Sequence, residues 1–470
     1  MLFLPELTTL GAGLVFFFFS LGRPSNDKVQ KSAIAVAGLT LLISLLCVRS
    51  EGTLFYGAYQ VDLFSQLFKV LIALGTLIIL LFSANDAGVK KGLQAEYYLF
   101  LFTAVLGLMM LVSSIELLAI FVALEVSSFA VYIMVPMRKN SITSGLQMEA
   151  GIKYLLYGVV ATGLMLFGMS YIYGLTGTTE LAKIAPALSK VYTQPAAIVA
   201  ILLVLAGFFY KLALFPLHFW VPDIYEGASN ETTAFIAAVP KLAAVALLIR
   251  MTNLVTGPGM VIVNVLGVCA VLSMFYGNLS ALVQKDIKRL LGFSGIAHAG
   301  FILLGLLTFQ LTGYGTAIYY IVGYLMMNLA CFLVICSISQ GGKNVAVEDF
   351  TGLHKRSPIL AITFTVALFA LAGIPPFVGF TGKFLLLLGA LKQGHLVIVT
   401  LAAINTAIAI YYYLSIVRVT FCTDDEDRGA VAINPLMSTL SVLLMLSIVV
   451  MGVFPSQFID MAGSALKLIH

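Results

Sequence analysis

Charged residues are scarce in this sequence. Of its 470 residues, 10% are Asp, Glu, Lys or Arg and 61% are hydrophobic, whereas roughly 25% of the residues in a soluble domain are charged. Apolar runs recur along the whole chain and leave no room for a sizeable soluble domain. The net charge of +5 does not imply a nucleic-acid partner, because a membrane protein needs basic loops to be oriented. The composition therefore predicts a polytopic protein of the lipid bilayer.

Clustered cysteines and cofactor-binding motifs are also missing. The scattered positions of the five cysteines argue against an iron–sulfur cluster held by the chain, and we find no glycine-rich dinucleotide motif or flavin site. Residues 1–21 lack the basic region and the small-residue cleavage site of a signal peptide, so we expect a retained first helix. The five cysteines are scattered, with no CxxC pair, as Cys47, Cys269, Cys331, Cys336 and Cys422.

The apolar runs divide into about fourteen membrane-spanning helices, since one span needs roughly 20 apolar residues. The sequence therefore predicts an all-α polytopic membrane fold, with almost no loop between the fourth and fifth spans. The spans fall near residues 2–21, 32–48, 61–84, 97–115, 116–135, 150–175, 195–220, 231–251, 258–280, 290–309, 313–339, 358–391, 395–420 and 433–455.

Lysine and arginine gather in alternate loops, fourteen on one side and six on the other. By the positive-inside rule the richer side is cytoplasmic, so both termini face outward, in agreement with an even number of spans. The length and the lack of a transit-like segment favour a bacterial inner membrane. The richer side has Arg23, Lys28, Lys31, Lys90, Lys91, Arg138, Lys139, Lys285, Lys288, Arg289, Lys343, Lys355, Arg356 and Arg428, and the poorer side has Arg49, Lys183, Lys190, Arg250, Lys392 and Lys467.

The remaining basic residues lie inside predicted helices. One charge at a helix centre costs about 2.5–3.5 kcal/mol on insertion scales, so such a residue is functional by default. Lysine suits proton transfer, because burial lowers its pKa and a nearby carboxylate raises it. Glu125 is the acid nearest the middle of its span. The six basic residues are Lys69, Lys153, Lys211, Lys241, Lys383 and Arg418.

Some of these charges have structural explanations. Asp62 and Lys69 are seven positions apart, so they share a helix face and form a local polar stripe. Arg418 lies near the cytoplasmic end of its span and reaches the interface. Glu116 is nine positions from Glu125, about 180° around a helix, so the two face opposite ways. Glu125 and the deeper lysines are therefore the functional candidates.

Two histidines lie inside predicted helices. His218 follows Lys211 by seven positions, which places it on the same helix face about 10 Å further along. His298 lies on a different helix and a protonated lysine is no ligand, so metal binding fits poorly. A lone buried histidine is usually a core residue, but we expect a functional role for His218 because it shares a stripe with a lysine.

Two spans contain helix-breaking residues beside a lysine. The seventh contains FFYKLALFPLHFW, in which Pro216 cannot donate a backbone hydrogen bond. The twelfth contains LAGIPPFVGFTGKF, in which Pro375 and Pro376 precede Lys383. Broken helices at corresponding positions of two halves indicate an ion site near the membrane midplane.

One offset of about 172 residues relates these two halves, and it predicts two inverted five-helix repeats. The pairs that it aligns are Lys211 with Lys383, Glu125 with His298, and Lys241 with Tyr412, which are 172, 173 and 171 residues apart. The predicted organisation is helices 1–3 in residues 1–96, the first repeat in 97–257, the second in 258–420, and helix 14 with a tail in 421–470.

Four segments resemble the antiporter-like membrane-arm subunits of respiratory complex I, NADH:quinone oxidoreductase, most closely the bacterial subunit N group. The resemblance runs roughly from the third span to Tyr413. It implies a fourteen-helix fold, two inverted five-helix repeats and a polar chain across the membrane plane. The segments are YKLALFPLHFWVPDIYEGA, IKYLLYGVVATGLMLFGMSYIYGLTG, KDIKRLLGFSGIAHAGF and LAGIPPFVGFTGKF.

The resemblance also implies residue roles. Glu125 matches a fifth-helix glutamate that pairs with a lysine and modulates its pKa, and Lys211 matches the lysine of the broken seventh helix. Lys241 matches the central lysine of the eighth helix, and Lys383 the exit-side lysine of the broken twelfth. Lys153 matches a sixth-helix lysine typical of the subunit N group. His218, His298 and Tyr412 fall where polar connectors are expected.

The resemblance therefore implies a proton-translocating subunit that is driven by quinone reduction elsewhere in the assembly. Its partners are expected to be other membrane-arm subunits of complex I. No cofactor is expected in this chain, whereas NADH, FMN, iron–sulfur clusters and quinone are expected in other subunits.

Three other hypotheses remain open. A subunit of a multisubunit cation/proton antiporter or of a membrane-bound hydrogenase shares the fold and much of the lysine pattern. A stand-alone secondary transporter also permits broken helices, but the polar interior is mostly titratable and offers no obvious substrate pocket. A purely structural subunit leaves the cost of the buried lysines unexplained.

Overall fold

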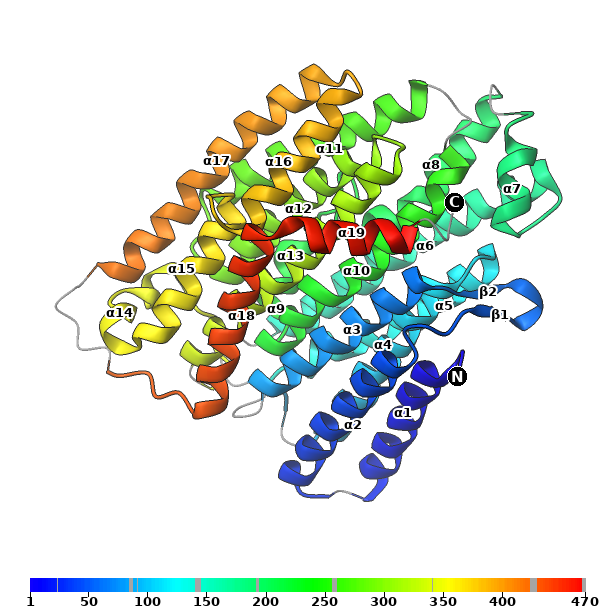
Figure 1. Ribbon diagram of the computed structural model, residues 1–470. Helices are drawn as coiled ribbons and strands as arrows, with labels where there is room; N and C mark the ends of the chain where they lie inside the picture. The colour runs from blue at the N-terminus through cyan, green and yellow to red at the C-terminus, as the bar shows by residue number, and fades with distance from the viewer. Residues whose placement is uncertain are drawn as a thin grey trace.

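The computed structural model describes residues 1–22, 24–83, 88–90, 92–139, 145–191, 194–255, 260–339, 341–422 and 429–466. This part of the chain is almost entirely helical, and its long helices run roughly side by side (Figure 1). The predicted loop residues Arg23, Lys91, Arg428 and Lys467 lie outside the described residues.

The N-terminal part contains three long helices and one short hairpin. In the hairpin, Gly52 pairs with Val61 in an antiparallel register, and three-residue strands are too short to leave an alternating pattern in the sequence. The chain then enters the third helix through Asp62, whose carboxylate accepts the Ser65 backbone N–H at 2.7 Å, as an N-cap should. The elements are α1 (Leu4–Gly22), α2 (Asn26–Leu46), β1 (Gly52–Leu54), β2 (Tyr59–Val61) and α3 (Leu63–Phe82).

Two sets of helices follow, each with one interrupted span. The first set is α4 (Gln94–Ser113), α5 (Leu117–Met134), α6 (Leu146–Thr176), the short α7 (Leu181–Leu188), α8 (Pro195–Leu212), α9 (Val221–Gly227) and α10 (Asn230–Val255). The second set is α11 (Met260–Ala281), α12 (Ile287–Leu306), α13 (Leu311–Ile338), the short α14 (Leu353–Arg356), α15 (Pro358–Ala372), α16 (Val378–Lys392) and α17 (Leu396–Phe421). The chain ends with α18 (Pro435–Val453) and α19 (Pro455–Leu466), and α19 lies across α3 and α13 (Figure 1).

The predicted fold class is confirmed. Within the described residues, thirteen helices are long and apolar enough to cross a membrane. The interrupted pair α15 and α16 accounts for the fourteenth span. In outer helices such as α2 and α17, only 28% of the most apolar 18-residue stretch is buried inside the protein, because the remaining apolar surface faces the lipid.

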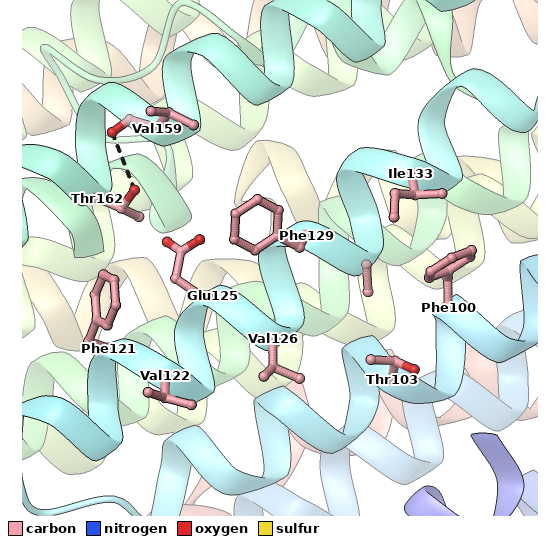
Figure 2. A pocket seen from close by; sticks show the side chains of 11 residues that line it. Phe100, Thr103, Phe121, Val122, Glu125, Val126, Phe129, Ile133, Val159 and Thr162 are labelled. Carbon is pink, nitrogen blue, oxygen red and sulfur yellow. Dashed lines mark hydrogen bonds between the residues drawn. The ribbon is translucent and has the colours of Figure 1, made fainter. Parts of the chain in front are cut away.

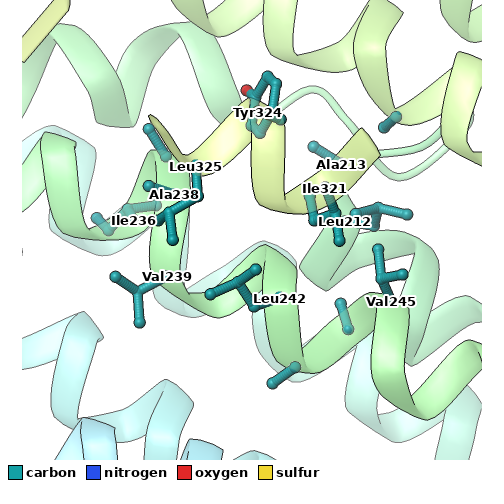
Figure 3. Close-up of a cluster of buried hydrophobic side chains, with 14 of the residues drawn as sticks. Leu212, Ala213, Ile236, Ala238, Val239, Leu242, Val245, Ile321, Tyr324 and Leu325 are labelled. Atoms are coloured by element: carbon teal, nitrogen blue, oxygen red, sulfur yellow. The ribbon is translucent and has the colours of Figure 1, made fainter. Parts of the chain in front are cut away.

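Helix α10 forms the centre of the bundle. Its most apolar 18-residue stretch is completely buried, and the helix packs against α3, α8 and α13. Figure 3 shows Leu242 and Val245 of α10 in the same apolar cluster as Ile321 of α13 and Leu212 at the end of α8. The helix that carries Lys241 therefore has no lipid-facing side.

Both predicted helix breaks are present, and they are built alike. The C-cap residue of α8 is Ala213, which has a left-handed backbone with φ 66°, and the C-cap residue of α15 is Gly373, with φ 87°. These two caps are 160 positions apart, as are Pro216 and Pro376. The breaks therefore align with an offset of 160, not 172, because Lys211 precedes its break and Lys383 follows its own. The inversion of the two repeats stays a prediction.

Candidate functional site

Lys211 lies in the last turn of α8, immediately before the break. Its side chain is buried, and its Nζ donates hydrogen bonds to Ser127 Oγ at 2.9 Å and Ser128 Oγ at 3.0 Å on α5. The Trp220 indole N–H donates to the Tyr210 carbonyl at 3.1 Å, which also accepts the backbone N–H of Ala213 at the end of the helix. The break therefore presents the ammonium group to neutral hydroxyls.

Glu125 also lies on α5, but on the lateral face of the chain. It is half-buried and lines a cavity of about 580 Å³ whose other walls are mainly apolar (Figure 2). Its Oε1 accepts no hydrogen bond from any residue that the structure describes. Lys211 is within electrostatic range of it, without a contact ion pair. Glu125 therefore lies near the middle of α5, as predicted, but at the lateral face of the chain.

Lys241 lies on the central helix α10. Its Nζ donates to the Gly295 carbonyl and to the Tyr324 hydroxyl, each at 3.2 Å, and lies 5.0 Å from the centre of the Tyr324 ring. A Cβ atom at Gly295 would lie 2.8 Å from this Nζ. Glycine at this position of α12 therefore leaves the space that the ammonium group occupies.

His298 connects the second set of helices to the central lysine. Its Nδ1 is hydrogen-bonded to the Tyr320 hydroxyl at 2.6 Å and its Nε2 to the Tyr413 hydroxyl at 3.3 Å. Lys241 and Lys383 are both within electrostatic range of the ring. The predicted connector on α17 was Tyr412, whose hydroxyl instead donates to Asn278. The neighbouring residue Tyr413 is the one that contacts His298.

Lys383 follows the break of the twelfth span and reaches back across it. Its Nζ donates to the carbonyls of Leu371 at 2.8 Å and Ala372 at 3.2 Å, which belong to the last turn of α15. The C-terminal end of a helix carries a partial negative charge of about −0.5. The broken helix itself therefore provides the electrostatic partner of this lysine.

The three lysines share one property. All are buried, and within the described part of the chain none has a carboxylate oxygen within 4.0 Å. A buried charge without a counter-charge is costly. Each of these ammonium groups is therefore held by neutral oxygen atoms. The lysines are Lys211, Lys241 and Lys383.

Lys69 differs from them, because it has a carboxylate partner. Its Nζ forms an ion pair with Glu6 of α1 at 2.7 Å, and both side chains are fully buried. Asp62, the expected neighbour in the stripe, receives two hydrogen bonds from Arg250 at 2.9 and 2.8 Å instead. Arg250 was counted among the loop residues, but it is buried in α10. These paired charges fit structural roles.

Two predicted site residues lie apart from the row. The side chain of Lys153 is 37% exposed and forms ion pairs with Glu149 and Asp223 at 2.7 and 2.6 Å. His218 does not continue the face of Lys211, because α8 ends at Leu212. Its buried ring packs among aromatic side chains, and neither ring nitrogen has a hydrogen-bond partner among the described residues.

Glu116 and Arg418 have the structural positions that we expected. The Glu116 carboxylate caps α5 by accepting the Ala119 backbone N–H at 2.8 Å. Arg418 is exposed in the last turn of α17.

Sequence reasoning missed a group of buried charges where α10 and α12 begin. Arg138 and Lys288 were assigned to exposed loops and Glu231 was not considered, but all three are buried. Each lies at or near an end of an apolar run, where the sequence does not distinguish a charged residue in an exposed loop from one that is buried. The segment KDIKRLLGF contains the one available signal, since Asp286 followed by an apolar run is typical of a helix start.

Comparisons with known proteins agree with this geometry. The family described as "NADH:quinone oxidoreductase/Mrp antiporter, TM" matches residues 114–409. NADH-quinone oxidoreductase subunit N 2 of Opitutus terrae is 47% identical over 99% of this chain and 98% of its own length.

Solved structures give the same result. A chain of respiratory complex I from Thermus thermophilus, with bound aureothin, has a TM-score of 0.85 and 30% identity over 98% of this chain and 99% of that chain. A chain of the Mrp complex from a Dietzia species has a TM-score of 0.86 at 20% identity over 99% of this chain and 97% of that one, which shows a shared fold alone. The chain therefore belongs to the NADH-quinone oxidoreductase subunit N family of antiporter-like membrane proteins.

Proposed function

We propose that this chain is a proton-translocating membrane subunit of an NADH:quinone oxidoreductase, and that Lys211, Lys241 and Lys383 carry the protons. One observation supports this most directly: within the residues that the structure describes, hydroxyl and carbonyl oxygens hold the three buried ammonium groups, and no carboxylate does. A lysine with a fixed carboxylate partner, such as Lys69 with Glu6, has its charged form favoured by that partner. A lysine on neutral partners can release its proton when a nearby charge changes.

The transfer follows the order of the contacts. Lys241 and Lys383 both influence His298, whose ring nitrogens can give and take protons. His298 is therefore the intermediate between the central lysine and the lysine of the second break. Lys211 responds to Glu125, so a change of charge in the lateral cavity alters the first lysine of the row.

The remaining assignments rest on the loops and on the family. The basic loops favour a bacterial inner membrane with both termini on the periplasmic side. Protons are taken up from the cytoplasmic side and released outward. NADH, FMN, iron–sulfur clusters and quinone belong to other subunits, because hydride and electron chemistry needs cofactors that this chain is not expected to bind. The other membrane-arm subunits are the partners.

The test is alanine at Lys241 or Lys211 in the assembled complex, with NADH-driven proton pumping measured in inverted membrane vesicles. We expect pumping to be lost, because a proton cannot pass a site without a titratable group. The matched control is Lys392→Ala, which removes an exposed lysine from α16. Full pumping and full quinone reduction by both variants would end this proposal.

Native gel electrophoresis separates this function from the related assemblies. A subunit of complex I co-migrates with NADH:quinone reductase activity. A subunit of a cation/proton antiporter or of a membrane-bound hydrogenase migrates without that activity.

A further inference from the structure

A second group of buried charges lies beside the row of lysines. Glu231 in the first turn of α10 is 5% exposed, and Lys288 in the first turn of α12 is fully buried. Glu231, Arg138 and Asp286 are all within electrostatic range of Lys288. We call these four residues the charge cluster. It combines two acids and two bases, and the mechanism above does not use it.

The basic members of the charge cluster have different environments. The Arg138 guanidinium donates to three backbone carbonyls and to the Asn344 side chain, so it is held in place as a structural cation. Among the described residues, the Lys288 Nζ has one hydrogen-bond acceptor, the Ala228 carbonyl at 2.8 Å. Lys288 is therefore the base that can exchange a proton.

One face of α12 leads from the charge cluster to the central lysine. Lys288, Gly292 and Gly295 are four and three positions apart, so they lie on the same helix face over about 10 Å. A Cβ at Gly292 would lie 3.2 Å from the Tyr225 ring, and one at Gly295 would lie 2.8 Å from Lys241 Nζ and 2.7 Å from the hydroxyl of Tyr324. Gly292 therefore leaves room for Val221 and the Tyr225 ring, and Gly295 leaves room for the Tyr324 hydroxyl and Lys241.

The hydroxyl group of Tyr225 has no role in the proton path proposed so far. The residue is fully buried, and its hydroxyl has no hydrogen-bond partner among the described residues. It lies within electrostatic range of Tyr324, whose hydroxyl accepts the hydrogen bond from Lys241. A buried phenol without a partner lowers stability and needs an explanation.

We propose that Tyr225 relays protons from the charge cluster to Lys241. The ammonium group of Lys288 gives a proton to the Tyr225 oxygen, directly or over a bridging water. The hydroxyl proton of Tyr225 passes to Tyr324, and that of Tyr324 passes to the neutral amine of Lys241. Lys288 ends neutral and Lys241 charged, while both phenols are unchanged, because a hydroxyl can donate and accept at once. The inference rests on the proposed function and adds its loading step.

The first test is Tyr225→Phe in the assembled complex, with pumping measured in ordinary and heavy water. We expect pumping to fall on the order of tenfold and its solvent isotope effect to rise, because loading becomes rate-limiting. Packing is retained, since the hydroxyl has no partner to lose. The control is Tyr319→Phe, which removes a hydroxyl bonded to the Met451 carbonyl and leaves pumping unchanged. An unchanged rate and isotope effect in Tyr225→Phe would overturn the relay.

The second test uses Glu231→Gln, which keeps an acceptor for the Gly88 backbone N–H but removes the acid that faces Lys288. If Tyr225→Phe does not assemble, Glu231→Gln is the only test. A wild-type pumping rate in Glu231→Gln then contradicts the relay. When both variants assemble, we expect their combination to pump no slower than the slower single variant, because one branch is interrupted twice. Independent, multiplied losses would contradict a shared branch.

The failure of the relay and the failure of the proposed function are distinguishable. If Lys241→Ala pumps normally, the proposed function is wrong. If Lys241→Ala is inactive and Tyr225→Phe pumps normally, only the relay is wrong.

Discussion

The two broken helices have the same backbone design but place their lysines on opposite sides of the break. Lys211 precedes the left-handed cap at Ala213, whereas Lys383 follows the cap at Gly373. With the breaks aligned, the position 160 residues before Lys383 is Asp223, and the position 160 residues after Lys211 is Leu371. Lys383 donates to the carbonyl of Leu371. The lysine of the second break therefore contacts the backbone at the position that corresponds to Lys211 in the first break.

This difference changes what each ammonium group meets. The hydroxyls of Ser127 and Ser128 accept from the charged amine of Lys211 and donate to the Leu124 carbonyl; either can rotate to donate to a neutral amine instead. The carbonyls around Lys383 can only accept, and they lie at the negative end of a half-helix. Lys211 is therefore suited to both protonation states, whereas Lys383 also completes the hydrogen bonding of its broken helix.

Methionine at each lysine tests this comparison most strongly. We expect Lys211→Met and Lys383→Met both to lose pumping, but only Lys383→Met to lower stability as well. Its two carbonyls lose their donor, at about 1–3 kcal/mol for each buried group left unpaired. The hydroxyls at Lys211 keep their bonds to the Leu124 carbonyl. Thermal unfolding of the purified complex and vesicle pumping measure the two effects.

The control for both substitutions is Lys392→Met, which changes an exposed lysine in the last turn of α16. Equal losses of stability at the two breaks would mean that the backbone contact of Lys383 contributes nothing.

The caps of the two breaks allow a smaller, complementary test. Gly373→Ala places a side chain at φ 87°, which costs about 1–2 kcal/mol, and its Cβ would lie 3.1 Å from Lys383 Cδ. Ala213→Gly relieves a similar strain at φ 66° but gains chain entropy in the unfolded state, about 0.4–1 kcal/mol. We expect the first to destabilise and the second to be nearly neutral in the midpoint of thermal unfolding. A neutral Gly373→Ala would show that the second break adapts freely.

Hydropathy predicted the helices well for a physical reason. Each span must satisfy its backbone inside the bilayer, so its length and composition are constrained. The breaks were also predictable, because proline removes a donor and glycine permits a left-handed cap. The order of residues already places Lys211 before its break and Lys383 after its own, although the breaks themselves align with an offset of 160 and not 172.

The surroundings of the charges were not predictable in the same way. Lipid is as apolar as a helix bundle, so hydropathy does not distinguish the central α10 from α6, where Lys153 is part-exposed. Partners far apart in sequence leave no local pattern: Asp62 binds Arg250, which lies 188 residues away. Charges near helix ends, such as Lys288, are assigned to loops unless the elements that cover them are known.

The smallest expected effect on stability concerns Asp223, which is the residue near the first break that corresponds to Lys383 near the second. Burial alone would raise the pKa of Asp223, but hydrogen bonds from Lys153 and Arg289 outweigh it and lower the pKa below the ordinary 3.8. Because the folded-state pKa lies below the unfolded one, this contribution to stability is complete above pH 3.8 and is lost as the pH falls through the folded-state value.

We therefore expect Asp223→Asn to lower stability by less than about 1 kcal/mol per ion pair near neutral pH, and the two proteins to converge in acid. Thermal unfolding of the detergent-solubilised protein along an acid series measures this. A constant difference down to the lowest pH would mean that Asp223 acts through packing and not through its charge. Asp223 would then stabilise the first break by its shape and not by its charge, and the electrostatic difference from Lys383 would disappear.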